Sequence, residues 1–238
     1  MNSPFAENSA AQLAQAVAQN VPYQGRKTIR RRSEVRRQAI LDASLRIIVR
    51  DGVRAVRHRA VAAEAGVPLS ATTYYFKDIN DLISDSFALH VERSATRQAA
   101  FWQRAQQALR VAPGLGEAAR RESLLEQVGA LLDGYLLEQL QQHRQALLVD
   151  QAFRQEALRN PLLAQLLRQQ RQILQNGLAQ LLALLGSQQP QQDAGLLTAV
   201  IAQMEYRGLL DGAEQRDRQQ LPALLRRHLQ PGPARACA

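Results

Sequence analysis

The stretch from Arg57 to Phe76, RHRAVAAEAGVPLSATTYYF, constrains the fold more than any other part of the chain. It predicts two short helices joined by a tight turn, the first over residues 57–65. Gly66 can adopt the left-handed conformation that ends this helix. Pro68 suits the first turn of the second helix, where its missing N–H is not needed. Because Ala62 is small, the second helix can cross closely, as in a helix-turn-helix.

The second helix of this pair carries compact and hydroxylated side chains, which can enter the DNA major groove and meet phosphates and base edges. Tyr75 and Phe76 are expected instead to anchor the helix in its own core. At the start of the first helix, basic side chains can face phosphates beside the positive helix end. An ordinary helical hairpin is the alternative. The candidate DNA-binding residues in and just after the two helices are Arg57, His58, Arg59, Leu69, Ser70, Ala71, Thr72, Thr73, Tyr74 and Lys77.

Basic residues are concentrated at the N-terminal end of the chain. The 238 residues carry a formal net charge of +9, from 30 Lys and Arg against 21 Asp and Glu. Up to Ala60 there are 12 basic and 4 acidic residues, which leaves 18 and 17 for the remainder. This distribution indicates a nucleic-acid-binding end joined to a nearly neutral body. An anionic membrane surface is the alternative partner, but no run approaches the ~20 apolar residues of a membrane span.

The first expected helix is preceded by a basic cluster of five residues, Arg26, Lys27, Arg30, Arg31 and Arg32. As part of an arm, these residues can follow phosphates or enter the adjacent minor groove. The alternative is a solvated tail. Few large apolar residues precede the cluster, so residues 1–32 are expected to form a flexible basic arm. Ser33 is the expected N-cap of the helix that follows.

These features together resemble the DNA-binding domain of TetR-family transcriptional repressors. The resemblance spans about Arg36 to Phe87 and rests on AVAAEAGVPLSATTYYFKD, preceded by Gly52-Val-Arg-Ala-Val and followed by a helix containing Leu82. It implies an all-α fold, with a three-helix helix-turn-helix domain over 33–79 and a helical effector-binding and dimerisation domain over 80–238. It also implies a cytoplasmic, dimeric repressor that binds a palindromic operator on double-stranded DNA and is released by a small organic effector.

The chain from about Val91 onward has a helical pattern throughout, without the alternation that predicts strands. Asp78 is the expected N-cap of the helix before this part, which by resemblance transmits the ligand signal. Leucine-rich faces near 161–185 and 191–211 are expected to pair with their copies in a homodimer, and packing within the monomer is the alternative. Breaks at proline and glycine imply helices near 91–111, 117–142, 144–158, 161–185, 191–211 and 217–229.

The remaining helices are expected to enclose a pocket for an unidentified small-molecule effector. For each candidate lining residue, simple packing is the alternative. We expect no enzyme, because the chain lacks a glycine-rich phosphate loop, GxSxG and HExxH. Neither a cofactor nor a metal is expected, and Cys237 is the only cysteine. A DNA-binding regulator controlled by a protein partner, without a small ligand, is the remaining alternative. The candidate pocket residues are Phe101, Trp102, Tyr135, Gln139, His143, Phe153 and Tyr206.

Overall fold

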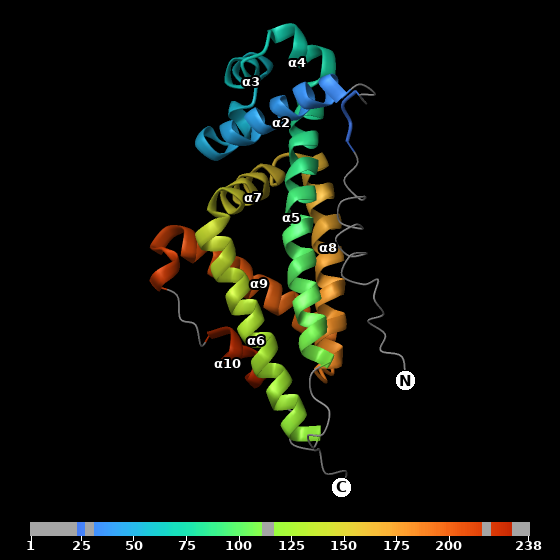
Figure 1. Ribbon diagram of the computed structural model, residues 1–238, viewed down its shortest axis with the longest axis vertical. Helices are drawn as coiled ribbons and strands as arrows, with labels where there is room; N and C mark the ends of the chain where they lie inside the picture. The colour runs from blue at the N-terminus through green and yellow to red at the C-terminus, as the bar shows by residue number, and fades with distance from the viewer. Residues whose placement is uncertain (1–22, 27–30, 111–116, 216–219, 230–238) are drawn as a thin grey trace. The chain divides into compact units, whose positions relative to one another are not determined.

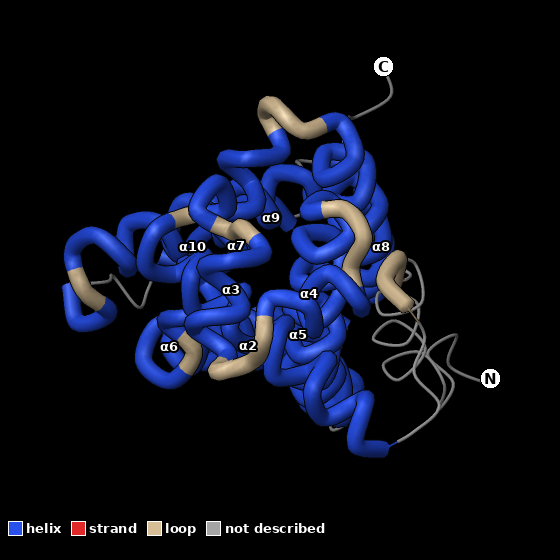
Figure 2. Tube along the Cα trace, turned by 90° about the horizontal axis from the view of Figure 1, so that it is seen from above, coloured by secondary structure: helices blue, strands red, loops and turns tan. Residues whose placement is uncertain are grey.

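The computed structural model of the protein describes residues 23–26, 31–110, 117–215 and 220–229. Every regular element within these ranges is helical (Figures 1 and 2). The all-α fold predicted from the sequence is therefore confirmed. No helix in these ranges combines the length and the apolar character needed to cross a membrane.

The helix-turn-helix region contains three α-helices and one 3-10 turn. Helix α4 packs against α3, and α3 in turn packs against α2 (Figure 1). Ile40, Val61 and Phe76 lie completely buried in this region. Apolar side chains spaced along each helix thus close a common core. The elements are α2 (Arg31–Asp51), η1 (Val53–Ala55), α3 (His58–Ala65) and α4 (Leu69–Tyr75).

The start of α2 differs from the prediction. The helix begins at Arg31, so Ser33 lies within its first turn and is not the N-cap. The hydroxyl groups of Ser33 and Tyr75 instead form a hydrogen bond of 2.9 Å. The Ser33 hydroxyl, which the local sequence pattern assigned to helix capping, therefore bonds to Tyr75 at the end of α4.

The next helix, α5 (Ile79–Arg110), is a single element of 32 residues. As predicted, Asp78 caps it: the carboxylate accepts the N–H of Asn80 at 2.8 Å. The carboxylate of Asp81 reaches back to the N–H of Asp78 at 3.4 Å, which completes a reciprocal cap. The helix boundary predicted near Val91 is wrong, because no proline or glycine interrupts the chain there and α5 continues.

The later helices agree closely with the bounds predicted from proline and glycine. Pro161 begins α8, and the Asn160 side chain accepts the N–H groups of Leu162 and Leu163 at 3.1 and 3.2 Å. Such a cap satisfies donors that have no partner within the helix. The elements are α6 (Glu117–Gln142), α7 (Arg144–Ala157), α8 (Pro161–Leu184), α9 (Pro190–Asp211), η2 (Ala213–Gln215) and α10 (Gln220–Leu229).

The structure divides into two compact units. The N-terminal unit comprises the described residues of Ala11–Arg97 together with Gln145–Arg171, so it contains α2 to α4 and most of α7. The C-terminal unit comprises the described residues from Gln98 to Arg144 and from Gln172 onward, where α6 packs against α9 and α10. Both α5 and α8 contribute residues to each unit. The functional domains predicted over 33–79 and 80–238 stay a prediction.

Candidate nucleic-acid interface

The turn between α3 and α4 depends on Gly66. This residue has φ 64° and ψ 33°, the left-handed conformation predicted for it. Its N–H donates to the carbonyl of Ala63 at 3.2 Å, and the N–H of Val67 donates to that of Ala62 at 3.0 Å. The two bonds satisfy carbonyls at the end of α3 while the chain reverses. Pro68 precedes α4 directly and does not enter its first turn.

The second helix of the pair, α4, has a buried face and an exposed face. Tyr75 is buried within it, and so is Phe76 just after it, as predicted. Ser70 and Thr73 are exposed. Tyr74 is 52% exposed, and its ring meets the Tyr75 ring edge-on, with the ring centres 5.1 Å apart. The exposed face thus combines the hydroxyl groups of Ser70 and Thr73 with the ring of Tyr74, which packs against the ring of Tyr75.

Thr72 does not lie where the sequence analysis placed it. Its side chain is completely buried, and its hydroxyl donates to the carbonyl of Leu69 at 2.8 Å. Thr72 and Tyr75 share the inner face because three residues make almost one helical turn. We therefore assign Thr72 to packing beneath α4, whereas Leu69 is exposed and Ala71 is half-buried.

Cationic side chains lie at the start of α3 and just beyond α4. Arg57 is the N-cap residue of α3, and both Arg57 and Arg59 are exposed. Lys77 follows α4 and is also exposed. His58 is half-buried, and its Nδ1 atom is enclosed without a hydrogen-bond partner. The two arginines and the lysine are therefore available to an anion, while His58 faces partly inward.

The arm predicted over residues 1–32 differs from the structure in two places. Arg31 and Arg32 are exposed in the first turn of α2 and do not precede that helix. Tyr23–Arg26, which we call the strap, belongs to the N-terminal unit and is bound to Tyr75 of α4 and Asp85 of α5. Arg30 and the other residues of the predicted arm lie outside the described residues.

The strap lies within the arm predicted to be flexible, and its last residue, Arg26, belongs to the predicted basic cluster; the structure adds contacts that fix its position. The backbone N–H of Arg26 donates to the carbonyl of Tyr75 at 2.9 Å. The guanidinium carbon of Arg26 lies 4.4 Å from the centre of the Tyr74 ring. This distance is within the range of a cation–π contact. In the sequence, the only local sign that the strap packs closely is Gly25, which lies immediately before the basic cluster.

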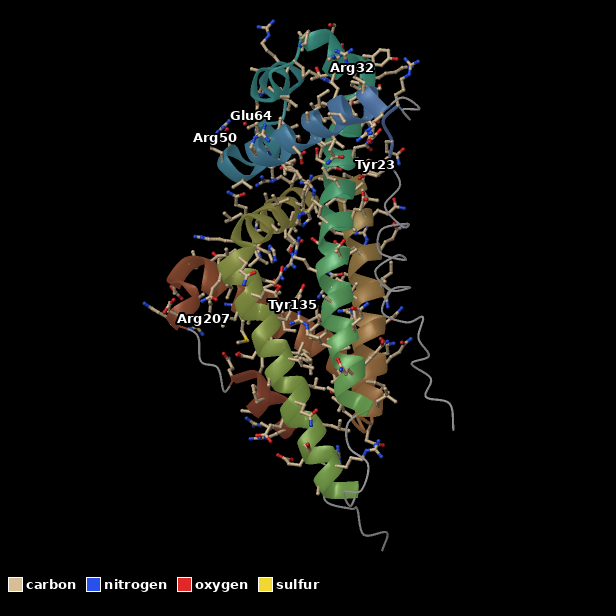
Figure 3. The ribbon with its side chains drawn as sticks, in the orientation of Figure 1. Tyr23, Arg32, Arg50, Glu64, Tyr135 and Arg207 are labelled. Carbon is tan, nitrogen blue, oxygen red and sulfur yellow. The ribbon has the colours of Figure 1, made fainter. Side chains whose placement is uncertain are left out.

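Ion pairs hold α3 against α2. Glu64 accepts Nε of Arg46 at 2.7 Å and Nη1 of Arg50 at 3.2 Å, and Figure 3 shows Arg50 and Glu64 close together. The hydrogen bond from Arg46, together with that from Arg50, lowers the pKa of the Glu64 carboxyl. Because both arginine side chains are largely exposed, these ion pairs orient the two helices more than they stabilise them.

The predicted effector-pocket residues do not form one group. Phe101, Trp102 and Tyr135 come together in the C-terminal unit, where Phe101 has its ring centre 5.2 Å from each of the other two. Tyr135 is labelled on α6 in Figure 3, and Gln139, about one turn further along, is buried. These four residues remain compatible with a shared site.

The other three predicted pocket residues lie elsewhere. Phe153 is completely buried in the N-terminal unit, where its ring meets that of Phe87 edge-on at 5.0 Å. His143, between α6 and α7, is half-buried. Tyr206 is half-exposed on α9. The prediction chose residues mainly because they are aromatic, and it therefore included a core residue, Phe153, and a surface residue, Tyr206.

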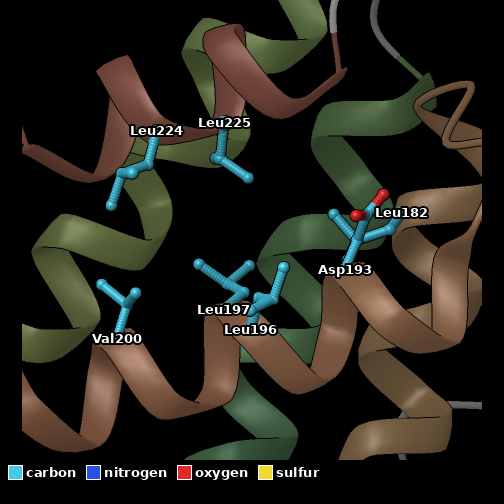
Figure 4. Close-up of a pocket in the computed structure, with 7 residues that line it drawn as sticks. All are labelled: Leu182, Asp193, Leu196, Leu197, Val200, Leu224 and Leu225. Carbon is cyan, nitrogen blue, oxygen red and sulfur yellow. The ribbon is translucent and has the colours of Figure 1, made fainter.

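A cavity in the C-terminal unit is lined by residues other than those predicted (Figure 4). Its walls come from α8, α9 and α10, and all but one of the lining side chains are aliphatic. The sequence pattern assigned several of these leucines to apolar helix faces that pack against other helices. Nothing further in the sequence distinguished them as the lining of a cavity. In the described ranges, no three His, Cys, Asp or Glu side chains gather as a metal site requires. The cavity is lined by Leu182, Asp193, Leu196, Leu197, Val200, Leu224 and Leu225.

Comparison with known proteins places this geometry among transcriptional regulators. No protein-family model and no curated protein matches the sequence. A TetR-family member from Streptomyces coelicolor A3 is 28% identical, with a TM-score of 0.52, over 83% of this chain and 99% of that one. The multidrug binding protein EbrR, complexed with imidazole, is 26% identical, with a TM-score of 0.53, over 90% and 98%.

A transcriptional regulator from Rhodococcus sp. Rha1 has a TM-score of 0.56 over 81% of this chain and 93% of that one. Its identity is 20%, so this likeness concerns the fold alone. The matches extend far beyond the helix-turn-helix and include most of the C-terminal helices. In sequence and in fold, the chain is therefore similar to a TetR-family transcriptional regulator.

Proposed function

We propose that the protein is a cytoplasmic, dimeric repressor that binds a palindromic operator on double-stranded DNA and is released by a small organic effector. The exposed face of α4 is the observation that carries this proposal. It presents hydroxyl groups and the Tyr74 ring beyond a turn that Gly66 holds in the left-handed conformation.

The side chains around α4 divide by chemistry into two groups. Arg57, Arg59 and Lys77 are exposed cations suited to phosphate oxygens. Their contacts would fix the position of the protein on the duplex without reading its sequence. Thr73 and Tyr74 carry the groups suited to base edges in the major groove. Ser70, Leu69 and Ala71 complete this proposed surface, whereas buried Thr72 supports it from below.

The dimer is proposed to form through α8 and α9. Large apolar side chains stand exposed on α9, with Leu196 at 55% and Leu210 at 66%. Tyr206 lies between them in sequence and is half-exposed. An exposed apolar surface of this kind favours a protein interface. A two-fold dimer would offer one recognition helix to each half-site, with centres about 34 Å apart or a multiple of that spacing.

An aromatic organic molecule is the proposed effector class. EbrR, which is 26% identical to this chain, is described as a multidrug binding protein and has been crystallised with malachite green. Phe101, Trp102 and Tyr135 gather three aromatic rings in the C-terminal unit. An effector that binds the DNA-free state more tightly must weaken DNA binding, and DNA must weaken effector binding by the same factor.

The DNA-binding proposal can be tested by selection from a random-sequence duplex pool with the purified full chain. We expect enrichment of an inverted repeat that resists competition by unselected DNA. Malachite green, as a probe of the effector class, should release the selected duplex at concentrations that leave wild-type folding intact. A pool that shows no enriched motif after repeated rounds would reject the operator-binding proposal.

The dimer proposal has a test of its own. Leu196→Glu and Leu210→Glu place a charge on the exposed side of α9, so we expect sedimentation velocity to show monomers where the wild type is a dimer. Leu158→Glu is the matched control, because Leu158 is 80% exposed and lies after α7. Dimers of unchanged stability in both α9 variants would place the interface elsewhere.

A further inference from the structure

The strap is held by a buried carboxylate of α5. Asp85 is completely buried, and its Oδ2 accepts the backbone N–H of Gly25 at 2.9 Å. The N–H of Gln24 donates to the other oxygen, Oδ1. Nη2 of Arg37 on α2 also donates to Oδ2, at 2.7 Å. One carboxylate therefore binds two consecutive peptide groups of the strap and an arginine of the neighbouring helix.

Side-chain contacts fasten the first residue of the strap as well. The Tyr23 ring lies 4.5 Å from the guanidinium carbon of Arg37, and its hydroxyl donates to Oε2 of Glu92 at 2.7 Å. Burial, followed by the bond to Glu92, raises the pKa of the Tyr23 hydroxyl above its usual range. The hydroxyl therefore stays a donor at neutral pH.

Gly25 allows the strap to approach this closely. A Cβ atom at this position would lie 2.7 Å from Oδ2 of Asp85 and 2.7 Å from Cε1 of the Phe76 ring. Both neighbours are completely buried, so neither has free space to enter. A side chain at residue 25 would therefore displace the strap from its seat.

The strap ends at Arg26, which is exposed beside the recognition helix. Its backbone is bound to the carbonyl of Tyr75, and its guanidinium stacks on the ring of Tyr74. Because the Tyr74 ring lies on the exposed face of α4, the charge of Arg26 is presented at the same surface. An arginine stacked on an aromatic ring still has N–H groups to offer a phosphate.

We infer that Arg26 is a further DNA-binding residue, positioned by the strap to contact a phosphate while it holds the Tyr74 ring against α4. The inference rests on the proposed function. Asp85 and Gly25 act as positioning residues, because they place the backbone from which Arg26 projects. A side chain fixed before binding loses less conformational freedom in the complex, so its contact contributes more to affinity.

The test measures fluorescence anisotropy of the duplex enriched by the wild-type chain, at several salt concentrations. Arg26→Ala should lower affinity about tenfold and reduce the salt slope by roughly 0.9 for each subunit on the duplex. Gly25→Ala should have the same effect, and the double variant should lose no more than either single variant. Arg26→Lys should restore the slope. Arg120→Ala, which removes an exposed charge from α6, is the control.

The outcomes separate the parts of the inference. Equal salt slopes for Arg26→Ala and Arg120→Ala would remove Arg26 from the interface. Effects of Gly25→Ala and Arg26→Ala that add in the double variant would reject positioning by the strap. Arg26 is exposed, so its variant should fold even if circular dichroism shows that Gly25→Ala does not. If no duplex is enriched at all, the proposed function fails, and this inference fails with it.

Discussion

Different kinds of interaction stabilise the interior of the N-terminal unit and the interior of the C-terminal unit. In the N-terminal unit, single polar or backbone features decide the local structure: Gly66 turns the chain, and buried Asp85 binds the strap and Arg37. In the C-terminal unit, leucines such as Leu136 and Leu181 fill the core. Hydrogen bonds require particular partners at particular angles, whereas apolar packing tolerates rearrangement. The unit that carries the proposed DNA-binding surface is thus the one with the more exacting interactions.

The largest test of this comparison is Asp85→Ala. Removal of the carboxylate takes the nearest anionic partner from buried Arg37 and the acceptor from two strap N–H groups, so we expect a loss of about 3–5 kcal/mol in the free energy of unfolding. Urea denaturation followed by circular dichroism measures this loss. Asp51→Ala removes an exposed carboxylate paired with Arg50 and should cost less than about 1 kcal/mol. Similar small losses in both variants would mean that Asp85 does not organise the N-terminal unit.

The matching substitution in the C-terminal unit is Leu181→Ala. Leu181 is almost completely buried, so the cavity should cost about 2–4 kcal/mol, somewhat less than loss of the buried charge. Leu184→Ala, about one turn away on the same helix and partly exposed, is the control for helix propensity and should cost about 1 kcal/mol or less. Urea unfolding at one fixed protein concentration compares them. A greater loss for Leu181→Ala than for Asp85→Ala would reverse the proposed contrast.

A smaller effect is expected at the turn itself. Gly66→Ala forces an L-residue into the left-handed conformation and should cost about 1–2 kcal/mol. No atom would crowd the added Cβ, so backbone strain is the sole expected cause. Thermal denaturation should therefore show that Gly66→Asn, which tolerates this conformation better, loses less stability than Gly66→Ala. The reverse order would indicate that the conformation of the turn is not what Gly66 provides.

The smallest effect concerns acid stability, where the N-terminal unit again depends on a specific charge. Burial alone would raise the pKa of Asp150, but His90 and Arg154 outweigh it and lower the pKa below its usual value. Nη2 of Arg154 lies 2.6 Å from Oδ2 of Asp150. This carboxylate therefore stabilises the fold above its ordinary pKa of about 3.9, and the stabilisation is lost as pH falls through the lower folded-state value.

Unfolding titrations at decreasing pH can detect this contribution. Asp150→Asn should reduce the dependence of stability on pH below about pH 4, because the group no longer titrates. The control, Asp51→Asn, alters an exposed carboxylate and should keep more of the wild-type acid dependence. Identical pH profiles for Asp150→Asn and the wild type would show that the charge of Asp150 is not needed for stability.

Local signals in the sequence were sufficient to predict most of the fold. Proline and glycine located most ends of α6 to α9, although neither marks the boundary between α6 and α7, and Gly66 located the turn, because each acts on its own stretch of backbone. Burial of Tyr75 and Phe76 also agreed with the prediction. The exposed face of α4 followed less completely: buried Thr72 is as small and polar as its exposed neighbours, so residue type alone did not separate them.

Long-range partners account for what the sequence did not reveal. Gly25 and Asp85 are 60 residues apart, and no periodic pattern connects a strap of four residues to the interior of α5. Ser33 likewise bonds to Tyr75, 42 residues away, although its local context favoured a cap. The DNA-binding roles of the exposed residues on α3 and α4 stay a prediction until DNA binding is measured.

The most direct measurement of the central claim compares Tyr74→Ala with Leu158→Ala on the duplex enriched by the wild-type chain. Both variants truncate an exposed side chain, and both should fold as the wild type does. Because Tyr74 stands on the exposed face of α4, its loss should weaken binding of the selected duplex by about tenfold or more. Leu158→Ala should bind as the wild type does. Equal affinities of the two variants for the selected duplex would contradict the assignment of α4 as the DNA-reading helix.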